Sequence, residues 1–228
     1  MLTIEDIRVA QGGFEICADW APQGPGIIAL IGPSGAGKST LLSAVGGFLT
    51  PETGRIVWDG QDITAHTPGQ RPTATLFQDN NLFPHLTVSQ NIALALHGQR
   101  LAKQETARRV EKVLHSVGLD GMEGRKPAQL SGGQQGRAAL ARVLLQDRPI
   151  VLLDEPFSAL GPALKAEMLD LVKEKLGRRL VLMVTHDPSD AKRIADRVSV
   201  VADHTATSPQ PTLSVFENPP DALRSYLG

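Results

Sequence analysis

The segment GPSGAGKST, residues 32–40, constrains the fold of this chain more than any other feature. It matches the phosphate-loop pattern G-x-x-x-x-G-K-[ST]. An apolar run suited to a buried strand, residues 27–31, precedes it, and a segment able to form a helix follows. Glycines here let backbone N–H groups turn toward phosphate oxygens, and the helix start adds a partial positive charge. The alternative is a glycine-rich turn without a ligand, which the flanking strand and helix disfavour.

The phosphate-loop pattern also assigns chemistry to single residues. Lys38 is expected to reach the β- and γ-phosphates of a nucleoside triphosphate, and Ser39 is expected to hold Mg²⁺. The residues of this loop that are predicted to bind the nucleotide are Gly32, Pro33, Ser34, Gly35, Ala36, Gly37, Lys38, Ser39 and Thr40.

Composition narrows the class of protein. The 228 residues suit one α/β domain, and a formal net charge of −1 gives no reason to expect nucleic acid as a partner. The single cysteine, Cys17, cannot form an intrachain disulfide. No apolar run approaches the roughly 20 residues of a membrane span, and the N-terminus does not resemble a signal peptide. We therefore expect a cytosolic protein that contacts a membrane only through a partner.

Short apolar runs alternate with helical patterns along the chain. Continuous apolar strands are typical of a parallel sheet that is covered on both faces. Residues 55–60 predict a strand closed by an Asp-Gly turn, and with residues 2–20 they predict an antiparallel sheet beside the main one. The predicted buried strands are residues 27–31, 73–77, 150–154 and 180–185.

Helix starts carry clear signals. Thr87 and Ser131 each begin a capping box, and Pro162 and Pro188 suit the first position of a helix. The stretch at about 87–135 is helical between two strands, which predicts an inserted helical subdomain.

These patterns predict an α/β fold with a mostly parallel core sheet, an N-terminal antiparallel β subdomain and the helical insertion. We interpret residues 1–228 as one nucleotide-binding domain. A short extension at about 204–228 is rich in Pro, Ser and Thr.

An acidic pair closes the apolar strand at 150–154. A strand that ends in Asp154 places this carboxylate at the carboxyl edge of a parallel sheet, where ligands bind in such folds. Asp154 is expected to hold Mg²⁺ through water, and Glu155 to orient or deprotonate an attacking water. The alternative is an Asp-Glu turn on the surface.

The segment LSGGQQGR, residues 130–137, predicts a helix capped by Ser131 with two glycines in its first turn. Free N–H groups at this positive end suit a phosphate, although a capped helix without a ligand would show the same pattern. The order of phosphate loop, LSGGQ and LLDEP resembles the nucleotide-binding subunits of ABC transporters over roughly residues 1–203. The resemblance implies an ABC-type P-loop NTPase that hydrolyses ATP with Mg²⁺.

The resemblance also implies a second copy of the chain. In that family two copies associate head to tail and close over two ATP molecules. Ser131, Gly133 and Gln134 would then contact the γ-phosphate of a nucleotide held by the other copy.

Two more strand ends resemble motifs of the family. Gln78 matches the Q-loop, where its amide would contact Mg²⁺ or the lytic water; a solvated glutamine is the alternative. His186 resembles the switch histidine, which would hydrogen-bond the γ-phosphate. The other five histidines match no motif and are expected on the surface or in loops.

The family resemblance places membrane partners beside the Q-loop. Residues at about 78–88 would meet transmembrane permease subunits, with Leu82 and Phe83 either at this interface or in the core. A periplasmic solute-binding protein would take part indirectly. The subunit would lie peripherally on the cytoplasmic face of the inner membrane.

Two positions depart from the family pattern. Gly161 stands where an Asp usually helps to connect the two sites of the dimer, so coupling between those sites is in doubt. The family also has an aromatic residue that stacks on adenine, near position 9 here. Residues 8–13 contain none, and Phe14 is the nearest candidate.

The short length and the segments at 47–51, 77–92 and 154–164 most resemble the ATPase subunits of bacterial thiamine importers. The resemblance implies import of thiamine or thiamine phosphates, and importers of other small solutes, such as iron or polyamines, are the alternative. A non-transport ABC ATPase would need a long coiled-coil insertion that this chain has no room for. A small-molecule kinase would not need LSGGQ.

Overall fold

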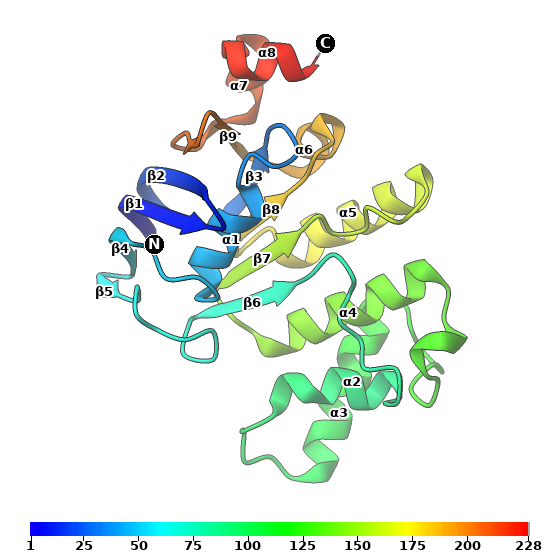
Figure 1. Ribbon diagram of the computed structural model, residues 1–228. Coiled ribbons are helices and arrows are strands. Elements are labelled where there is room, and N and C mark those ends of the chain that lie inside the picture. Colours follow the sequence, from blue (N-terminus) through cyan, green and yellow to red (C-terminus); the bar gives the residue numbers. More distant parts are fainter. Residues whose placement is uncertain (228) are drawn as a thin grey trace.

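The computed structural model describes the backbone of residues 1–227 and the side chains of residues 1–224, and one curled sheet runs through it (Figure 1). Five strands of this sheet are parallel, and they follow the order β9-β3-β8-β7-β6. Their bounds are β3 (Gly26–Ile31), β6 (Thr73–Leu76), β7 (Ile150–Asp154), β8 (Leu180–Val184) and β9 (Arg197–Ala202).

Both faces of the parallel strands are buried, as the apolar runs predicted. Along β3, the side chains of Ile27, Ala29 and Ile31 pack into one hydrophobic cluster. Ile28 and Leu30 pack into a second cluster on the opposite face. Because successive side chains of a strand point to opposite faces, a strand that is covered twice needs apolar residues throughout. The predicted parallel core sheet is confirmed.

The predicted antiparallel strands form the other end of the sheet. They are β1 (Leu2–Gln11), β2 (Phe14–Gln23), β4 (Thr53–Trp58) and β5 (Gln61–Asp62). β1 pairs with β2 and β4, and the predicted turn at Asp59 and Gly60 has positive φ at both residues. The strand β10 (Thr205–Ala206) lies between β2 and β9 and joins the two parts. The extension after residue 204 therefore begins inside the sheet, which its composition did not indicate.

Helices cover both faces of the parallel strands (Figure 1). The helix α1 (Lys38–Gly46) packs its apolar residues into the second cluster, together with residues of β1, β2 and β4. On the other face, α5 (Pro162–Leu176) and α6 (Pro188–Ile194) pack into the first cluster. The chain then adds β11 (Gln210–Pro211), which pairs with β9, and the helices α7 (Thr212–Glu217) and α8 (Asp221–Leu227).

A third hydrophobic cluster lies among the helices between β6 and β7, drawn in green in Figure 1. These elements are α2 (Val88–Ala93), the 3₁₀ turn η1 (Leu94–Leu96), α3 (Lys103–Ser116), the 3₁₀ turn η2 (Pro127–Gln129) and α4 (Gly132–Gln146). Helix α4 continues well past the expected boundary at 135. It contributes Ala138 and Ala141 to the third cluster, and Ala139 and Leu140 to the first. It therefore connects the helical insertion to the core.

The predicted helix starts are confirmed. The hydroxyl groups of Thr87 and Ser131 accept hydrogen bonds from the backbone N–H three residues later, and the glutamines at those positions complete both capping boxes. Pro162 and Pro188 are the first residues of α5 and α6. Within the described part of the chain, no helix combines the length and apolar character that crossing a membrane requires.

Candidate functional site

The phosphate loop connects β3 to α1, as its sequence predicted. Gly32 has φ +152°, and a Cβ at this position would lie 2.0 Å from the carbonyl oxygen of Val201. Gly35 and Gly37 have φ +78° and +97°, which residues with a side chain rarely adopt. The glycines therefore have steric reasons to be here, and the loop begins α1 with N–H groups that the helix does not use.

The side chain of Lys38 is buried under this loop. Its ammonium group donates hydrogen bonds to the carbonyl oxygens of Gly32 at 2.8 Å and Pro33 at 2.7 Å. Burial lowers the pKa of Lys38, while the carboxylates of Glu155 and Asp154 act in the opposite direction. The charge is thus held at the loop by backbone carbonyls, where it is available to a phosphate.

Ser39 and Asp154 lie in contact, although 115 positions separate them in the sequence. The Ser39 hydroxyl donates to Asp154 Oδ1 at 2.7 Å. Burial raises the pKa of Asp154 against the effect of this hydrogen bond, and the charge of Glu155 adds to the rise. A hydroxyl and a carboxylate are the oxygen ligands that Mg²⁺ prefers, and a cation there would favour the ionised carboxylate. The pair fits a magnesium site.

Glu155 and His186 meet at the ends of the neighbouring strands β7 and β8. The imidazole Nδ1 of His186 lies 3.1 Å from Glu155 Oε2. Glu155 has φ +43°, and its backbone N–H donates to the carbonyl oxygen of Val184. This left-handed conformation turns the Glu155 side chain away from the path of the strand. The Glu155 carboxylate thus lies against His186, whereas the Asp154 carboxylate accepts from Ser39.

A cavity of about 360 Å³ opens beside these groups. It is lined by Glu155, by residues of the phosphate loop, and by Gln11 and Phe14 of the β1–β2 hairpin. The Phe14 ring fills the space above Gly37, where a Cβ would lie 2.7 Å from its Cε1 atom. The other residues that line the cavity are Ser34, Gly35, Gly37, Lys38, Ser39 and Thr40.

The ring of Phe14 also contacts His204, a residue that matched no motif. The two ring centroids are 5.0 Å apart, and the planes are inclined by 35°. His204 lies in the turn between β9 and β10, and both residues line a second cavity of about 360 Å³ beside the phosphate loop. The pairing of β10 with β2 brings His204 here, and the carbonyl oxygen of His204 accepts from the backbone N–H of Cys17 at 2.8 Å. No local pattern could have indicated this contact.

Gln78 follows β6 and is exposed. The strand order β3-β8-β7-β6 brings the carboxyl end of β6 to the same sheet edge as Lys38, His186 and Glu155. The next residues form a turn in which Asn80 and Asn81 have positive φ, +59° and +46°.

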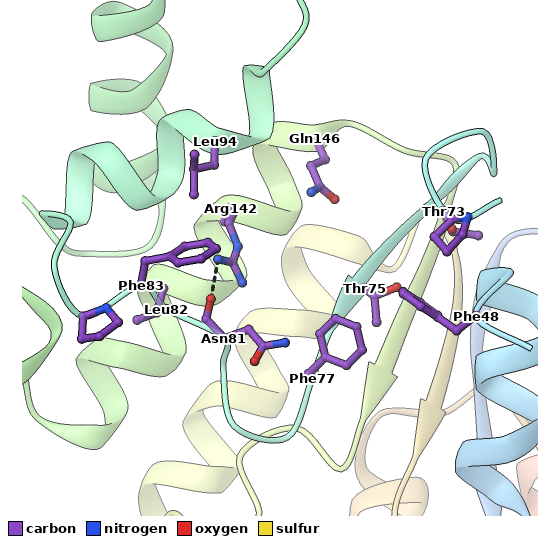
Figure 2. Close-up of a pocket in the computed structure, with 12 residues that line it drawn as sticks. Phe48, Thr73, Thr75, Phe77, Asn81, Leu82, Phe83, Leu94, Arg142 and Gln146 are labelled. Carbon is purple, nitrogen blue, oxygen red and sulfur yellow. Dashed lines mark hydrogen bonds between the residues drawn. The ribbon is translucent and has the colours of Figure 1, made fainter.

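Arg142, from the middle of α4, stabilises this turn. Its guanidinium group donates to the carbonyl oxygens of Asn81 at 2.7 Å and Asn80 at 3.0 Å, and Figure 2 shows the contact with Asn81. Burial lowers the pKa of Arg142. Arg142 was missed by sequence reasoning because its partners are backbone atoms about 60 positions away, which no side-chain motif records.

A groove lies beside the same turn, between β6 and the helical insertion (Figure 2). Its volume is about 640 Å³. Phe83 is 47% exposed there, whereas Leu82 is half-buried against the first and third clusters. Leu82 therefore packs against the core, and Phe83 is free of the core as an interface residue would need to be. The groove is lined by Phe48, Pro68, Thr73, Thr75, Phe77, Asn81, Leu82, Phe83, Pro84, Leu94, Arg142 and Gln146.

The LSGGQ segment is separate from the phosphate-loop cavity within one chain. Ser131 is exposed at the start of α4, and its cap with Gln134 uses both of their side chains. Gly133 is buried, and a Cβ there would lie 2.7 Å from a methyl group of Leu164 in α5. Packing against α5 therefore explains this glycine without a ligand. The segment does not join the residues that line the phosphate-loop cavity.

Comparisons with known proteins are consistent with this geometry. A model of the ABC transporter family matches residues 23–158. The thiamine import ATP-binding protein ThiQ of Ruegeria sp. (strain TM1040) is 56% identical over 100% of both chains, and that of Yersinia pestis is 48% identical over 100% of this chain and 97% of its own. A dimeric post-hydrolysis structure of the ATP-binding cassette MJ0796 bound to ADP and Pi has a TM-score of 0.79 at 28% identity. That match covers 93% of this chain and 99% of the other.

Proposed function

Because the chain belongs to the ABC transporter family, we propose that it is the ATP-hydrolysing subunit of an importer for thiamine or thiamine phosphates. The family and the fold establish the ATPase class. The assignment of thiamine as the transported solute rests on the 56% identity, over the full length of both chains, to a protein named for thiamine import.

The phosphate loop and its neighbours would hold the nucleotide. Backbone N–H groups at the start of α1 and the ammonium group of Lys38 would contact the phosphates. Ser39, Asp154 and Gln78 would hold Mg²⁺, which supplies charge neutralisation between the phosphates when it is bound. The support for this arrangement is the 2.7 Å contact between Ser39 and Asp154 beside the buried lysine.

Glu155 would polarise the water that attacks the γ-phosphate. Its carboxylate lines the phosphate-loop cavity and lies next to the imidazole of His186, which would hydrogen-bond the γ-phosphate. In phosphoryl transfer most of the catalysis comes from positioning and charge stabilisation, so small displacements of these groups should change the rate.

A second copy of the chain would complete each site. Ser131, Gly133 and Gln134 do not line the phosphate-loop cavity of their own chain, and Ser131 is exposed at a helix start. In a head-to-tail dimer these residues would contact the nucleotide of the other copy. The related MJ0796 cassette is described as a dimer, which supports this proposal.

The groove beside Phe83 would receive a transmembrane permease subunit. It has an exposed aromatic side chain, and it adjoins the turn that follows Gln78, so a docked partner would lie close to the site. The chain would then be peripheral, on the cytoplasmic face of the inner membrane. A periplasmic solute-binding protein would act only through the permease.

Uptake of labelled thiamine by a strain that lacks this gene tests the proposal. The wild-type gene should restore uptake, whereas Glu155→Gln should bind ATP normally and lower ATP turnover and uptake about a hundredfold or more, since it removes a general base. Glu174→Gln, at an exposed glutamate of α5, is the matched control and should behave as wild type. ATPase activity without thiamine uptake would contradict thiamine as the transported solute. ATP turnover retained by Glu155→Gln would contradict the catalytic role of Glu155.

A further inference from the structure

A partly buried ion-pair cluster links α5 to the start of α6. The ammonium group of Lys165 lies 2.7 Å from Asp190 Oδ2 and 3.1 Å from Asp187 Oδ2. The side chains of Lys165 and Asp190 are only 14% and 8% exposed. Burial alone lowers the pKa of Lys165, but the hydrogen bonds and charges of the two carboxylates outweigh it and raise the pKa overall. The lysine is therefore charged at neutral pH.

The same carboxylates shape the turn that carries His186. The Thr185 hydroxyl donates to Asp190 Oδ2 at 2.6 Å and accepts from the backbone N–H of Asp187 at 3.0 Å. Asp187 caps α6 by accepting from the backbone and hydroxyl of Ser189. His186 is thus flanked on both sides by residues of one hydrogen-bonded network. Lys165 is the member of this network that comes from another element.

Lys165 also lies close to the position where this chain departs from its family. It is in the first turn of α5, and its backbone N–H donates to the carbonyl oxygen of Gly161 at 2.9 Å. The segment 158–161 directly precedes α5 and ends at Gly161, where the family resemblance implies an Asp that helps to connect the two sites of a dimer. A shift of this segment would move Lys165, and through Lys165 the turn at 185–190.

We propose that Lys165 is a positioning residue that sets the orientation of His186 by holding Asp187 and Asp190. This inference rests on the proposed role of His186 in ATP hydrolysis. Lys165 would thereby connect the segment 158–161 physically to His186. This connection would not require a side chain at position 161.

A second ion pair between the same helices provides a matched control. Arg193 of α6 donates to Asp170 of α5 through Nε at 2.9 Å and through Nη2 at 2.6 Å. The side chains of this pair are 45% and 57% exposed, and the hydrogen bonds between them involve no side chain of the turn at 185–190. Arg193→Met therefore removes an ion pair between α5 and α6 without removing a partner of the turn at 185–190, and it should cost less stability than Lys165→Met because the Arg193 pair is exposed.

ATPase kinetics of the full-length chain test the proposal. Lys165→Met should lower kcat about tenfold or more with KM changed less than about twofold, since it displaces a group that acts in the transition state. Lys165→Arg should restore most of kcat, and Arg193→Met should leave it unchanged. Because Lys165→Met leaves a buried carboxylate unpaired, the double variant Lys165→Met, Asp190→Asn is measured as well; it should fold and still show the loss.

The imidazole NMR signal of His186, assigned by its disappearance in His186→Ala, gives a second readout. It should shift in Lys165→Met and return in Lys165→Arg, and Arg193→Met should not move it. Unchanged kcat and an unchanged signal in the folded lysine variants would overturn the inference, as would an equal loss in Arg193→Met. Full activity of His186→Ala would instead overturn the proposed function of that histidine.

Discussion

At the scale of single residues, side-chain identity matters most where the backbone leaves no alternative. Gly32 must be a glycine because a Cβ would overlap the carbonyl of Val201. At Gly37 the absence of a side chain leaves space, and the ring of Phe14 fills that space. The phosphate-loop cavity therefore has an aromatic ring on one face, although residues 8–13 contain no aromatic side chain.

We predict that Phe14→Ala weakens ATP binding about tenfold, because stacking of a base on an aromatic ring contributes roughly 1–3 kcal/mol. Phe14→Tyr keeps a ring and is expected to bind ATP as wild type does. Equilibrium titration with a fluorescent ATP analogue measures both variants. An unchanged affinity in Phe14→Ala would count against stacking.

At the scale of elements, helix starts combine structural and chemical roles. Thr87 and Ser131 make the same capping box at α2 and α4, so their contributions to helix stability should be similar. Only the start of α4 has the two glycines that the family places against a phosphate. A comparison of the two caps therefore separates stability from function.

We predict that Ser131→Ala and Thr87→Ala each lower the free energy of unfolding by about 1 kcal/mol, the usual effect of losing an N-cap. Thermal or denaturant unfolding measures this loss. Only Ser131→Ala should also lower the ATPase activity of the isolated chain, because only Ser131 is proposed to contact nucleotide. Equal ATPase loss in both variants would show that the effect is structural.

At the scale of the whole molecule, the working unit is proposed to be two chains. The site of one chain contains Lys38, Ser39, Asp154 and Glu155, and the proposed closing groups begin at Ser131 of the other copy. Gly161 lies in the segment expected to connect the two sites, and it is exposed with no neighbour within 4 Å of a Cβ. Its φ of −62° accepts any side chain.

We predict that Gly161→Asp changes ATPase activity without changing ATP affinity, because the carboxylate would reach the dimer interface rather than the nucleotide of its own chain. Gly161 is the N-cap of α5, where Asp and Asn stabilise a helix slightly more than Gly does. Gly161→Asn is therefore the control for capping without charge. Equal activity of Gly161→Asp and wild type would contradict a coupling role.

Much of the fold could be predicted because its signals are local. The buried strands follow from apolar runs, and β7 ends at Asp154 as its sequence indicated. The caps at Thr87 and Ser131 need only residues three positions apart. The tail after residue 204 could not be predicted, because the two-residue strand β10 exists only through its pairing with β2 and β9.

The phosphate loop is encoded locally, since Lys38 and Ser39 lie within one turn of its glycines, and the apolar runs encode which strands are buried. The contact of Ser39 with Asp154, and that of Lys165 with Asp190, arise only when the chain has folded. These contacts depend on the strand order β3-β8-β7-β6 and on the helices packed against it, which bring distant segments to one sheet edge. Local patterns do not encode that order, because it is set by how the whole chain buries its apolar surface.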